Sequence, residues 1–331
     1  MIKDSIRIVD DCSASTELWE EVAVACDYAT FFHTPEWADI FSRYTKGRIH
    51  PAPRKITFED NVCAVIPLCR KQYLSGAFQI YLSSPVGTFG GWLSRDTVTP
   101  PHTRLLIDYM LNLDDVAWRE NPYDPLLGAL SIEGAVDDFT QVVDLTQSPD
   151  ALQKLASRAH AKAVRKALRE GVTVDEAHSL DDWEQHFRAY ELSLVRWKKA
   201  GTEKKHFKPY TWELFKIIFK NKSPHCKLWC ARYKGLIAAS VLCFYWNTHA
   251  VAWHGSALEE FFGVRPNNLL YQHMIDHARE AGYRWFDCNT PGGLKGVVEF
   301  KDNLGTQRLR SRLLDKASTK RKILHKIKRM F

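Results

Sequence analysis

The chain has 331 residues, of which 45% are hydrophobic and 12% aromatic. Its length suits two domains better than one, and its composition excludes disordered, collagen-like and coiled-coil proteins. The formal net charge of +7 has a local origin, because residues 316–331 hold seven basic residues and no acid. Removing those seven from the 46 Lys and Arg residues leaves 39 against 39 acids, so charge arguments concern this tail and local patches.

The same sequence limits the compartment and the metal chemistry. No apolar run reaches the ~18 residues that a membrane span requires, and the beginning of the chain lacks the apolar segment of a secretory signal. We therefore expect a cytoplasmic protein. The eight cysteines include no CxxC pair, and Cys226 and Cys230 have no second close pair to complete a zinc site. Free thiols and no metal are the expectation.

The first half of the chain alternates helical and strand patterns. Thr34 and Pro35 form an N-cap and a first helical residue, which predicts a helix to Tyr44. Two strands over 51–60 and 61–71 should form a hairpin around an acidic turn. Further along we expect a strand with a glycine-rich loop over 81–94, a helix over 99–113 and a strand over 137–144.

The second half opens with a strong basic helix predicted over 150–170 and ended by Gly171. The alternation that follows indicates a mixed α/β protein. We expect a strand at 172–179, helices at 180–201 and 209–221, a hairpin at 226–246 around Lys234 and Gly235, a strand at 248–257, a helix from Pro266 to Gly282, and a strand at 283–290.

An internal echo divides the chain. The segments 57–69 and 231–243 both have a turn before an apolar strand ending in cysteine, and they lie about half the chain apart. This pattern suggests two copies of one α/β unit, over residues 1–147 and 148–315, with a basic amphipathic tail at 316–331. The alternative is that the two segments are not copies of one unit, because any two β-meanders share such a pattern.

Three motifs in the second half carry a resemblance to a known family. They are Arg165-Lys166-Ala167 before Gly171-Val172, then Ala278-x-x-x-Gly282-x-x-x-Phe286-Asp287, and Gly296-x-x-x-Phe300-Lys301-x-x-x-Gly305. In this order the chain resembles the FemAB family and its GNAT-like relatives over roughly residues 30–312. The resemblance implies two tandem GNAT-like units, with mixed central sheets flanked by helices. It also implies transfer of an acyl group to an amine, without a metal or redox cofactor.

The resemblance places Lys301 at the reaction centre. Acyl transfer to an amine passes through a tetrahedral oxyanion, which a fixed cation stabilises; the alternative is a surface lysine near a strand end. Asp287 could orient the attacking amine or accept its proton, or could cap its own loop. His254 is a general-base candidate, or a histidine packed among aromatic side chains. Phe300, Asn289 and Thr290 are candidate substrate contacts.

The segment before the predicted helix at Pro266 bears on the acyl donor. Coenzyme A-dependent GNAT enzymes have a basic, glycine-rich loop there, whose N–H groups hold the pyrophosphate. This chain has EEFFGVRPNN, which keeps one glycine and Arg265 but lacks the second glycine. Arg265, Asn267 and Asn268 are the candidate donor-binding residues. In the first half, the resemblance makes Trp37 and Tyr44 candidate residues of the acceptor cleft.

Three basic features could bind RNA or another polyanion. They are the predicted helix with Arg158, Lys162, Arg165, Lys166 and Arg169, the stretch from Arg196 to Lys208, and the tail. Each could equally be a solvated face. The tail also contains apolar residues and could instead lie on the surface of an anionic membrane.

Three functions remain open. The first is transfer of an aminoacyl group from aminoacyl-tRNA, as co-substrate, to the amine of a cell-wall or related precursor, small or lipid-linked. The second is acyl-CoA-dependent N-acylation of an amino sugar or amino acid. The third is a catalytically silent module that binds polysaccharide or membrane machinery through the basic tail.

Overall fold

The computed structural model describes residues 6–73, 78–199 and 209–318. The chain divides into two compact units, and the first of them is discontinuous in sequence. Unit 1 comprises Met1–Phe139 and Arg310–Phe331, and unit 2 comprises Thr140–Leu309. The alternation of helices and strands in both units confirms the expected mixed α/β fold class.

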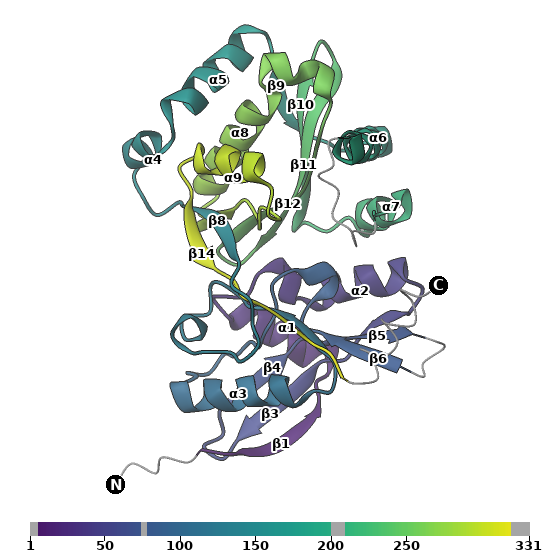
Figure 1. Ribbon diagram of the computed structural model, residues 1–331, viewed down its shortest axis with the longest axis vertical. Helices are drawn as coiled ribbons and strands as arrows, with labels where there is room; N and C mark the ends of the chain where they lie inside the picture. The colour runs from purple at the N-terminus through teal and green to yellow at the C-terminus, as the bar shows by residue number, and fades with distance from the viewer. Residues whose placement is uncertain (1–5, 74–77, 200–208, 319–331) are drawn as a thin grey trace. The chain divides into compact units, whose positions relative to one another are not determined.

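Unit 1 contains two sheets and three α-helices within the described residues (Figure 1). One sheet has the strand order β1-β3-β4 and the other β15-β7-β6-β5-β2. The elements are β1 (Ile8–Ser13), α1 (Thr16–Ala25), α2 (Pro35–Tyr44), β2 (Ile49–Pro51), β3 (Arg54–Phe58), β4 (Cys63–Ile66), β5 (Cys69–Tyr73), β6 (Phe78–Leu82), α3 (Pro100–Asn112), β7 (Val116–Arg119) and β15 (Leu313–Lys316).

Unit 2 is built on one seven-stranded sheet with the order β14-β8-β13-β12-β11-β10-β9. Helices α6 and α7 lie on one side of this sheet, and α5, α8 and α9 lie on the other (Figure 1). The elements are β8 (Phe139–Asp144), α4 (Pro149–Leu155), α5 (Arg158–Arg169), β9 (Thr173–Glu176), α6 (Leu180–Lys199), α7 (Trp212–Asn221), β10 (Cys226–Tyr233), β11 (Leu236–Trp246), β12 (His249–Ala257), α8 (Pro266–Glu280), β13 (Trp285–Asp287), α9 (Lys295–Asp302) and β14 (Gln307–Arg310).

Most local predictions are confirmed, and the reason is visible at the helix ends. The Thr34 side chain accepts a hydrogen bond from the Trp37 N–H at the start of α2. Both predicted hairpins are present as the antiparallel pairs β3–β4 and β10–β11. Gly171 follows α5 with a φ of +82°, a conformation that glycine adopts without steric cost.

The single helix predicted over 150–170 is wrong, because the chain forms two helices there. Ala156 and Ser157 have extended backbone between α4 and α5. The Ser157 side chain accepts the N–H of His160, and the Ser157 N–H donates to the Asn303 carbonyl. The break is therefore fixed by a helix cap and by a contact with the end of α9, which a helical periodicity does not reveal.

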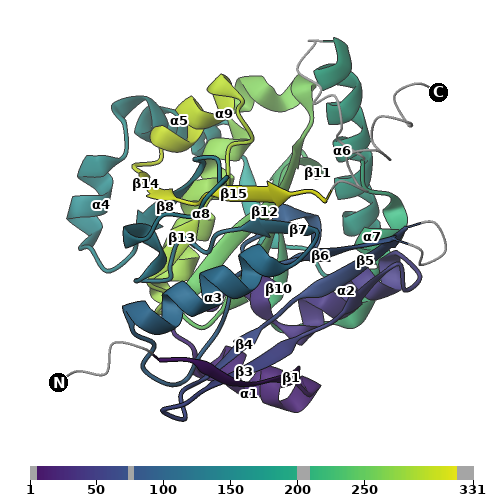
Figure 2. The ribbon, with the colours of Figure 1, turned by 60° about the horizontal axis from the view of Figure 1, so that its bottom comes forward.

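The two units differ from the expected domains at both boundaries. The structure begins unit 2 at Thr140, within β8, rather than at residue 148. It also returns residues from Arg310 onward to unit 1, where β15 pairs with β7 (Figure 2). Lys316, counted with the tail, ends β15, and residues 319–331 of the tail lie outside the described residues.

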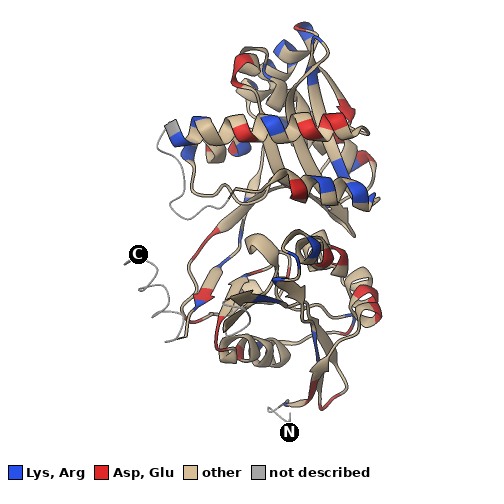
Figure 3. Ribbon diagram, turned by 90° about the vertical axis from the view of Figure 1, so that its right-hand side faces the viewer, with Lys and Arg blue, Asp and Glu red and all other residues tan. Residues whose placement is uncertain are grey.

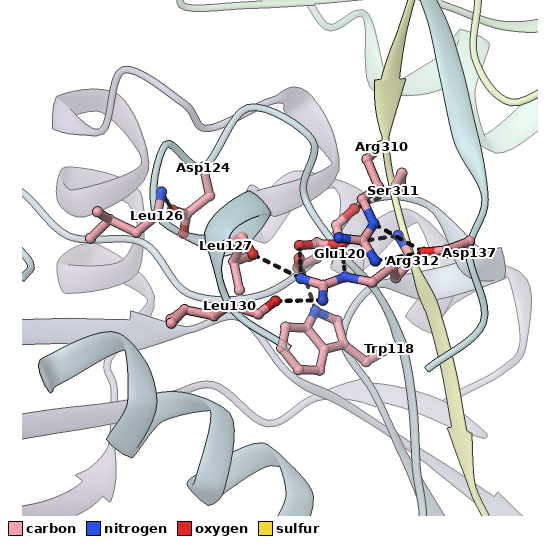
Figure 4. A network of polar contacts seen from close by, with 11 residues as sticks. Trp118, Glu120, Asp124, Leu126, Leu127, Leu130, Asp137, Arg310, Ser311 and Arg312 are labelled. Atoms are coloured by element: carbon pink, nitrogen blue, oxygen red, sulfur yellow. Dashed lines mark hydrogen bonds and ion pairs between the residues drawn. The ribbon is translucent and has the colours of Figure 1, made fainter. Parts of the chain in front are cut away.

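A buried ion pair fixes the returning segment in unit 1 (Figure 4). The side chains of Arg312 and Glu120 are each 3% exposed, and the Arg312 Nη2 lies 2.6 Å from the Glu120 Oε1. Arg312 also donates to the carbonyls of Leu127 and Leu130. Because the guanidinium is satisfied by a carboxylate and two carbonyls, its burial is compensated.

Charge is mixed along most of the described helices, as α6 illustrates (Figure 3). That helix begins with Asp181 and Asp182 and ends in basic residues. Helix α5 is different, because it contains basic residues and no acid. Among the described residues, no helix is long and apolar enough to cross a membrane.

Candidate functional site

Lys301 is a buried cation in the last turn of α9. Lys301 is only 5% exposed, and its Nζ donates to the Asn289 carbonyl at 2.8 Å. Burial lowers the pKa of the Lys301 ammonium, and the negative charge of the nearby Asp287 partly opposes that effect. The alternative of a surface lysine near a strand end is wrong, since Lys301 is helical and buried.

The residues after β13 form a polar turn around that ammonium. The Asp287 carboxylate accepts the Asn289 N–H at 2.6 Å and the Thr140 hydroxyl at 2.5 Å. The Asn289 side chain accepts the Thr290 N–H, and Asn289 has a φ of +63°. Asp287 is 0% exposed. It therefore stabilises the turn that presents the Asn289 carbonyl, which is the capping role that the sequence also allowed.

Gln141 of β8 connects this turn to α9. Its backbone carbonyl accepts the Cys288 N–H at 2.9 Å. Its side-chain Nε2 donates to the Val298 carbonyl at 3.1 Å and to the Asp302 Oδ1 at 2.7 Å. The turn, the strand and the helix that carries Lys301 are thus joined through one side chain.

A cavity of about 640 Å³ opens between α5, the start of α8 and α9. Four cations and one acid line it, so its electrostatic character is positive. The charged lining residues are Lys162, Lys166, Arg169, Arg265 and Glu299, and Asn268 and Phe300 complete the part predicted from the sequence. Asn267, the third donor-binding candidate, is not among the residues that line it.

His160 fixes α5 against α8 at the edge of this cavity. Its Nδ1 lies 3.1 Å from the Asn268 Nδ2, and its Nε2 lies 3.1 Å from the Gln272 Oε1. An amide NH₂ only donates and an amide oxygen only accepts, so His160 carries its proton on Nε2. Burial lowers its pKa, which keeps the ring in this neutral state. The neighbouring cations of α5 are thereby held beside the start of α8.

The start of α8 has no side-chain cap. Arg265 occupies the N-cap position with a φ of +61°, and Pro266 follows as the first helical residue. The N–H groups and dipole of a helix start favour an anion, and here they face a cavity whose walls already carry cations. The arrangement suits the phosphate groups of a bound molecule.

His254 lies elsewhere in unit 2, on the side of the sheet covered by α6 and α7. Its Nδ1 is 3.0 Å from the Nε2 of His186, and its ring contacts those of Tyr190 and Phe215. Burial lowers the pKa of His254 to about 3. This geometry favours the aromatic-packed alternative over a general base, because a base works best with a pKa near the working pH.

The two candidates in unit 1 differ in accessibility. Trp37 is 0% exposed and packs against Phe31, Phe32 and Phe41, while its Nε1 donates to Thr88. The expectation that Trp37 contacts a substrate is wrong, because it is a core residue of unit 1. Tyr44 is partly buried at the end of α2, with its ring 6.1 Å from that of Phe41.

Sequence reasoning missed Gln141, His160 and Cys288 as members of this region. Cys288 is 2% exposed, and burial raises the pKa of its thiol to about 12, so it stays neutral beside Lys301. Gln141 and His160 belong to no recognisable sequence motif. A signal was available only for Cys288, which follows the motif residue Asp287.

Comparison with known proteins agrees with this architecture. Residues 156–302 match the family model of the acetyltransferase (GNAT) domain, and no curated protein matches the chain in sequence. The chain is similar in fold to FemX, with a TM-score of 0.64, 12% identity and coverage of 93% of this chain and 98% of FemX.

Two further solved structures share the fold. One is the C-terminal domain of a candidate lysylphosphatidylglycerol synthetase from Agrobacterium fabrum, with a TM-score of 0.55, 15% identity and coverage of 92% and 94% of the two chains. The other is a conserved protein of unknown function from Bacteroides thetaiotaomicron, with a TM-score of 0.53, 10% identity and coverage of 93% and 98%. The likeness therefore extends over both units.

Proposed function

We propose that this chain, a FemAB-like acyltransferase with a GNAT-type domain in its second half, transfers an aminoacyl group from aminoacyl-tRNA to the amine of a cell-wall or related precursor. The observation that carries the proposal is the cationic cavity at the start of α8. Helix α9 lines this cavity with residues that directly precede the buried Lys301. The cavity supplies a place for donor phosphates, and Lys301 supplies a fixed positive charge.

The proposed reaction makes one bond and breaks one bond. The acceptor amine attacks the ester carbonyl of the aminoacyl group, and a tetrahedral oxyanion forms. When it collapses, the new C–N amide bond remains, the C–O ester bond breaks, and the terminal ribose oxygen of the tRNA leaves with a proton from the amine. A fixed ammonium such as that of Lys301 lowers the energy of the oxyanion, because its charge needs no reorganisation during the reaction.

Two features favour tRNA as the donor. Helix α5 carries five basic residues and no acid. Two of them, Arg158 and Arg165, are exposed and do not line the cavity, so they extend the positive surface beyond it. A long polyanion uses such a surface better than a single pyrophosphate does. The loop before α8 also lacks the second glycine of a coenzyme A site.

Acyl-CoA is the second candidate donor, and the match to an acetyltransferase domain favours it. The helix start at Arg265 and Pro266 could hold a pyrophosphate without the usual glycine. In that case the acceptor would be an amino sugar or an amino acid. Both candidates need no resident cofactor, since the donor is a co-substrate in each.

The first experiment tests the chemistry. Purified protein is given tRNA charged with a labelled amino acid and an amine-bearing peptidoglycan precursor, and amide product is measured. Lys301→Ala should lower kcat about 100-fold, with the fold retained by circular dichroism. Lys295→Ala is the matched control, because Lys295 lies on the same helix with its side chain 91% exposed. Equal transfer by Lys301→Ala would remove Lys301 from the mechanism.

The second experiment separates the two donors. Charged tRNA should bind with an affinity that falls steeply with salt, and the double variant Lys162→Gln, Lys166→Gln should bind more weakly with a shallower salt dependence. Lys154→Gln on α4 is the control, because Lys154 is exposed and does not line the cavity. Saturable thermal stabilisation by an acyl-CoA, with none by tRNA, would favour the coenzyme A reaction instead.

A further inference from the structure

Helix α9 is held in place mainly by polar contacts. It has eight residues, and its one buried residue is Lys301. The Phe300 ring adds a contact with Tyr271 at 5.2 Å between centroids. A helix of this length with so little apolar burial needs other anchors to keep one position. The position of the Lys301 ammonium therefore depends on the hydrogen bonds that α9 makes.

Gln141 supplies two of those hydrogen bonds from within the sheet. Its NH₂ group binds the Val298 carbonyl and the Asp302 carboxylate, three residues before Lys301 and one after it. Its backbone carbonyl binds the Cys288 N–H, next to Asn289. Lys301 in turn donates to the Asn289 carbonyl. One residue thus fixes both the helix that carries the ammonium and the turn that carries its acceptor.

We infer that Gln141 is a positioning residue for Lys301, holding the buried ammonium at the reaction centre without touching the substrate. This inference rests on the proposed function for the identity of the reaction, and on the geometry alone for the contact it describes. Gln141 is 0% exposed, so it acts through α9 and the 288–290 turn.

The orientation of the Gln141 amide supports this role. Within the described residues its Oε1 is buried and has no hydrogen-bond partner. An unsatisfied buried oxygen costs about 1–3 kcal/mol. Exchanging the oxygen and nitrogen would place the oxygen against a carbonyl and a carboxylate, which is worse. The amide is therefore oriented by its NH₂ group, and its purpose in the packing is to donate to α9.

The charged and titratable groups around Lys301 define what a change should do. Asp287 and Cys288 face it from the end of β13, and Asp302 follows it on α9. The Cys288 thiol is neutral, and Asp287 is engaged by Thr140 and Asn289. If α9 moves outward, water reaches the ammonium, and the pKa of Lys301 should rise toward its ordinary value.

The test is Gln141→Met, which keeps the side-chain length and removes both donors together with the unpaired oxygen. Lys301 is followed by competitive labelling with trace acetic anhydride over a pH series, with the Lys301 peptide quantified by mass spectrometry. We expect the labelling midpoint to rise by about one pH unit, and kcat to fall about tenfold with the donor KM unchanged. Gln307→Met, an exposed change on β14, should leave both unchanged.

A second pair of variants guards against loss of folding. Asp302 is exposed, so its substitution is less disruptive, and Asp302→Ala should shift the Lys301 midpoint in the same direction by a smaller amount. Asp302→Asn keeps an acceptor for Gln141 and should restore the original midpoint. An unchanged midpoint in folded Gln141→Met and in Asp302→Ala would overturn the inference. The labelling midpoint is measured in the absence of any acyl donor. It therefore tests the inference even if the protein does not use aminoacyl-tRNA.

Discussion

At the scale of single residues, the chain keeps a lysine and two histidines away from water. Lys301 is held by a carbonyl and has a lowered pKa. His186 and His254 bond each other between the sheet, α6 and α7, and burial lowers the pKa of both. Each of these groups makes stability depend on pH, because its proton affinity differs between the folded and unfolded chains.

The buried ammonium of Lys301 predicts a rise of stability in alkali. The folded chain has the lower pKa, so between that value and the ordinary 10.5 the unfolded chain binds more protons. The free energy of unfolding should therefore rise with pH in this window relative to Lys301→Met. Urea denaturation of both proteins at pH 7 and pH 10 measures the difference. An equal change in the free energy of unfolding between the two pH values in both proteins would contradict the burial of a charged lysine.

The histidine pair predicts a loss of stability in acid. Burial places the pKa of His254 at about 3, below its ordinary 6.5. The unfolded chain thus takes up a proton first, and stability falls as the pH drops from about 6.5 toward about 3. His254→Phe, which suits the aromatic surroundings, should reduce that fall between pH 7 and pH 5. The measurement is urea denaturation, with His178→Phe, at an exposed site after β9, as the control.

At the scale of elements, the break between α4 and α5 and the end of α9 depend on each other. The Ser157 N–H donates to the Asn303 carbonyl. Gly305 lies so close to this break that a Cβ added there would be 2.9 Å from the Ala156 nitrogen. Close packing at this point sets the wall of the cationic cavity, since α5 and α9 both contribute to it.

This contact predicts that Gly305→Ala is strongly destabilising. The φ of +83° costs an alanine about 1–2 kcal/mol, and the clash with the backbone at Ala156 adds to it. Gly282→Ala is the matched control, because its φ is +84° and nothing lies within 4 Å of its added Cβ. Thermal denaturation should show a larger loss for Gly305→Ala. Equal losses would mean that the 155–157 backbone yields freely.

At the scale of the whole molecule, unit 1 is completed only by the end of the described chain. β15 pairs with β7 over four residue pairs from Leu313–Arg119 to Lys316–Val116. Arg312, just before β15, enters the buried pair with Glu120. Unit 1 therefore closes its sheet with residues that follow the whole of unit 2 in sequence.

The buried pair predicts a large effect at Arg312 and a small one at its neighbour. Arg312→Met leaves the carboxylate of Glu120 buried without its partner, which should cost about 3–5 kcal/mol. Arg310→Met removes an ion pair with Asp137 whose side chains are 49% and 76% exposed, and should change stability by less than about 1 kcal/mol. Chemical denaturation compares the two. A small loss for Arg312→Met would show that Glu120 finds another partner or water.

Much of the fold and part of the site could be predicted from the sequence. Periodicity and caps predicted the helix after Thr34, both hairpins and the helix that starts at Pro266, because these features depend on residues close together in the chain. The order of the motifs indicated a resemblance to the FemAB family, and the GNAT domain model matches residues 156–302. That resemblance selected Lys301, Asp287 and Arg265. These residues lie in unit 2, two of them at one turn and the third at the cationic cavity.

The tertiary structure decided the rest. It showed Lys301 buried against Asn289, Trp37 in the core of unit 1, and His254 on a different side of the sheet. The contacts responsible join residues far apart in the chain, such as Gln141 with Asp302, 161 positions away, and Glu120 with Arg312, 192 positions away. Nothing local marks such pairs, because burial and hydrogen bonding between them exist only once the sheets have formed.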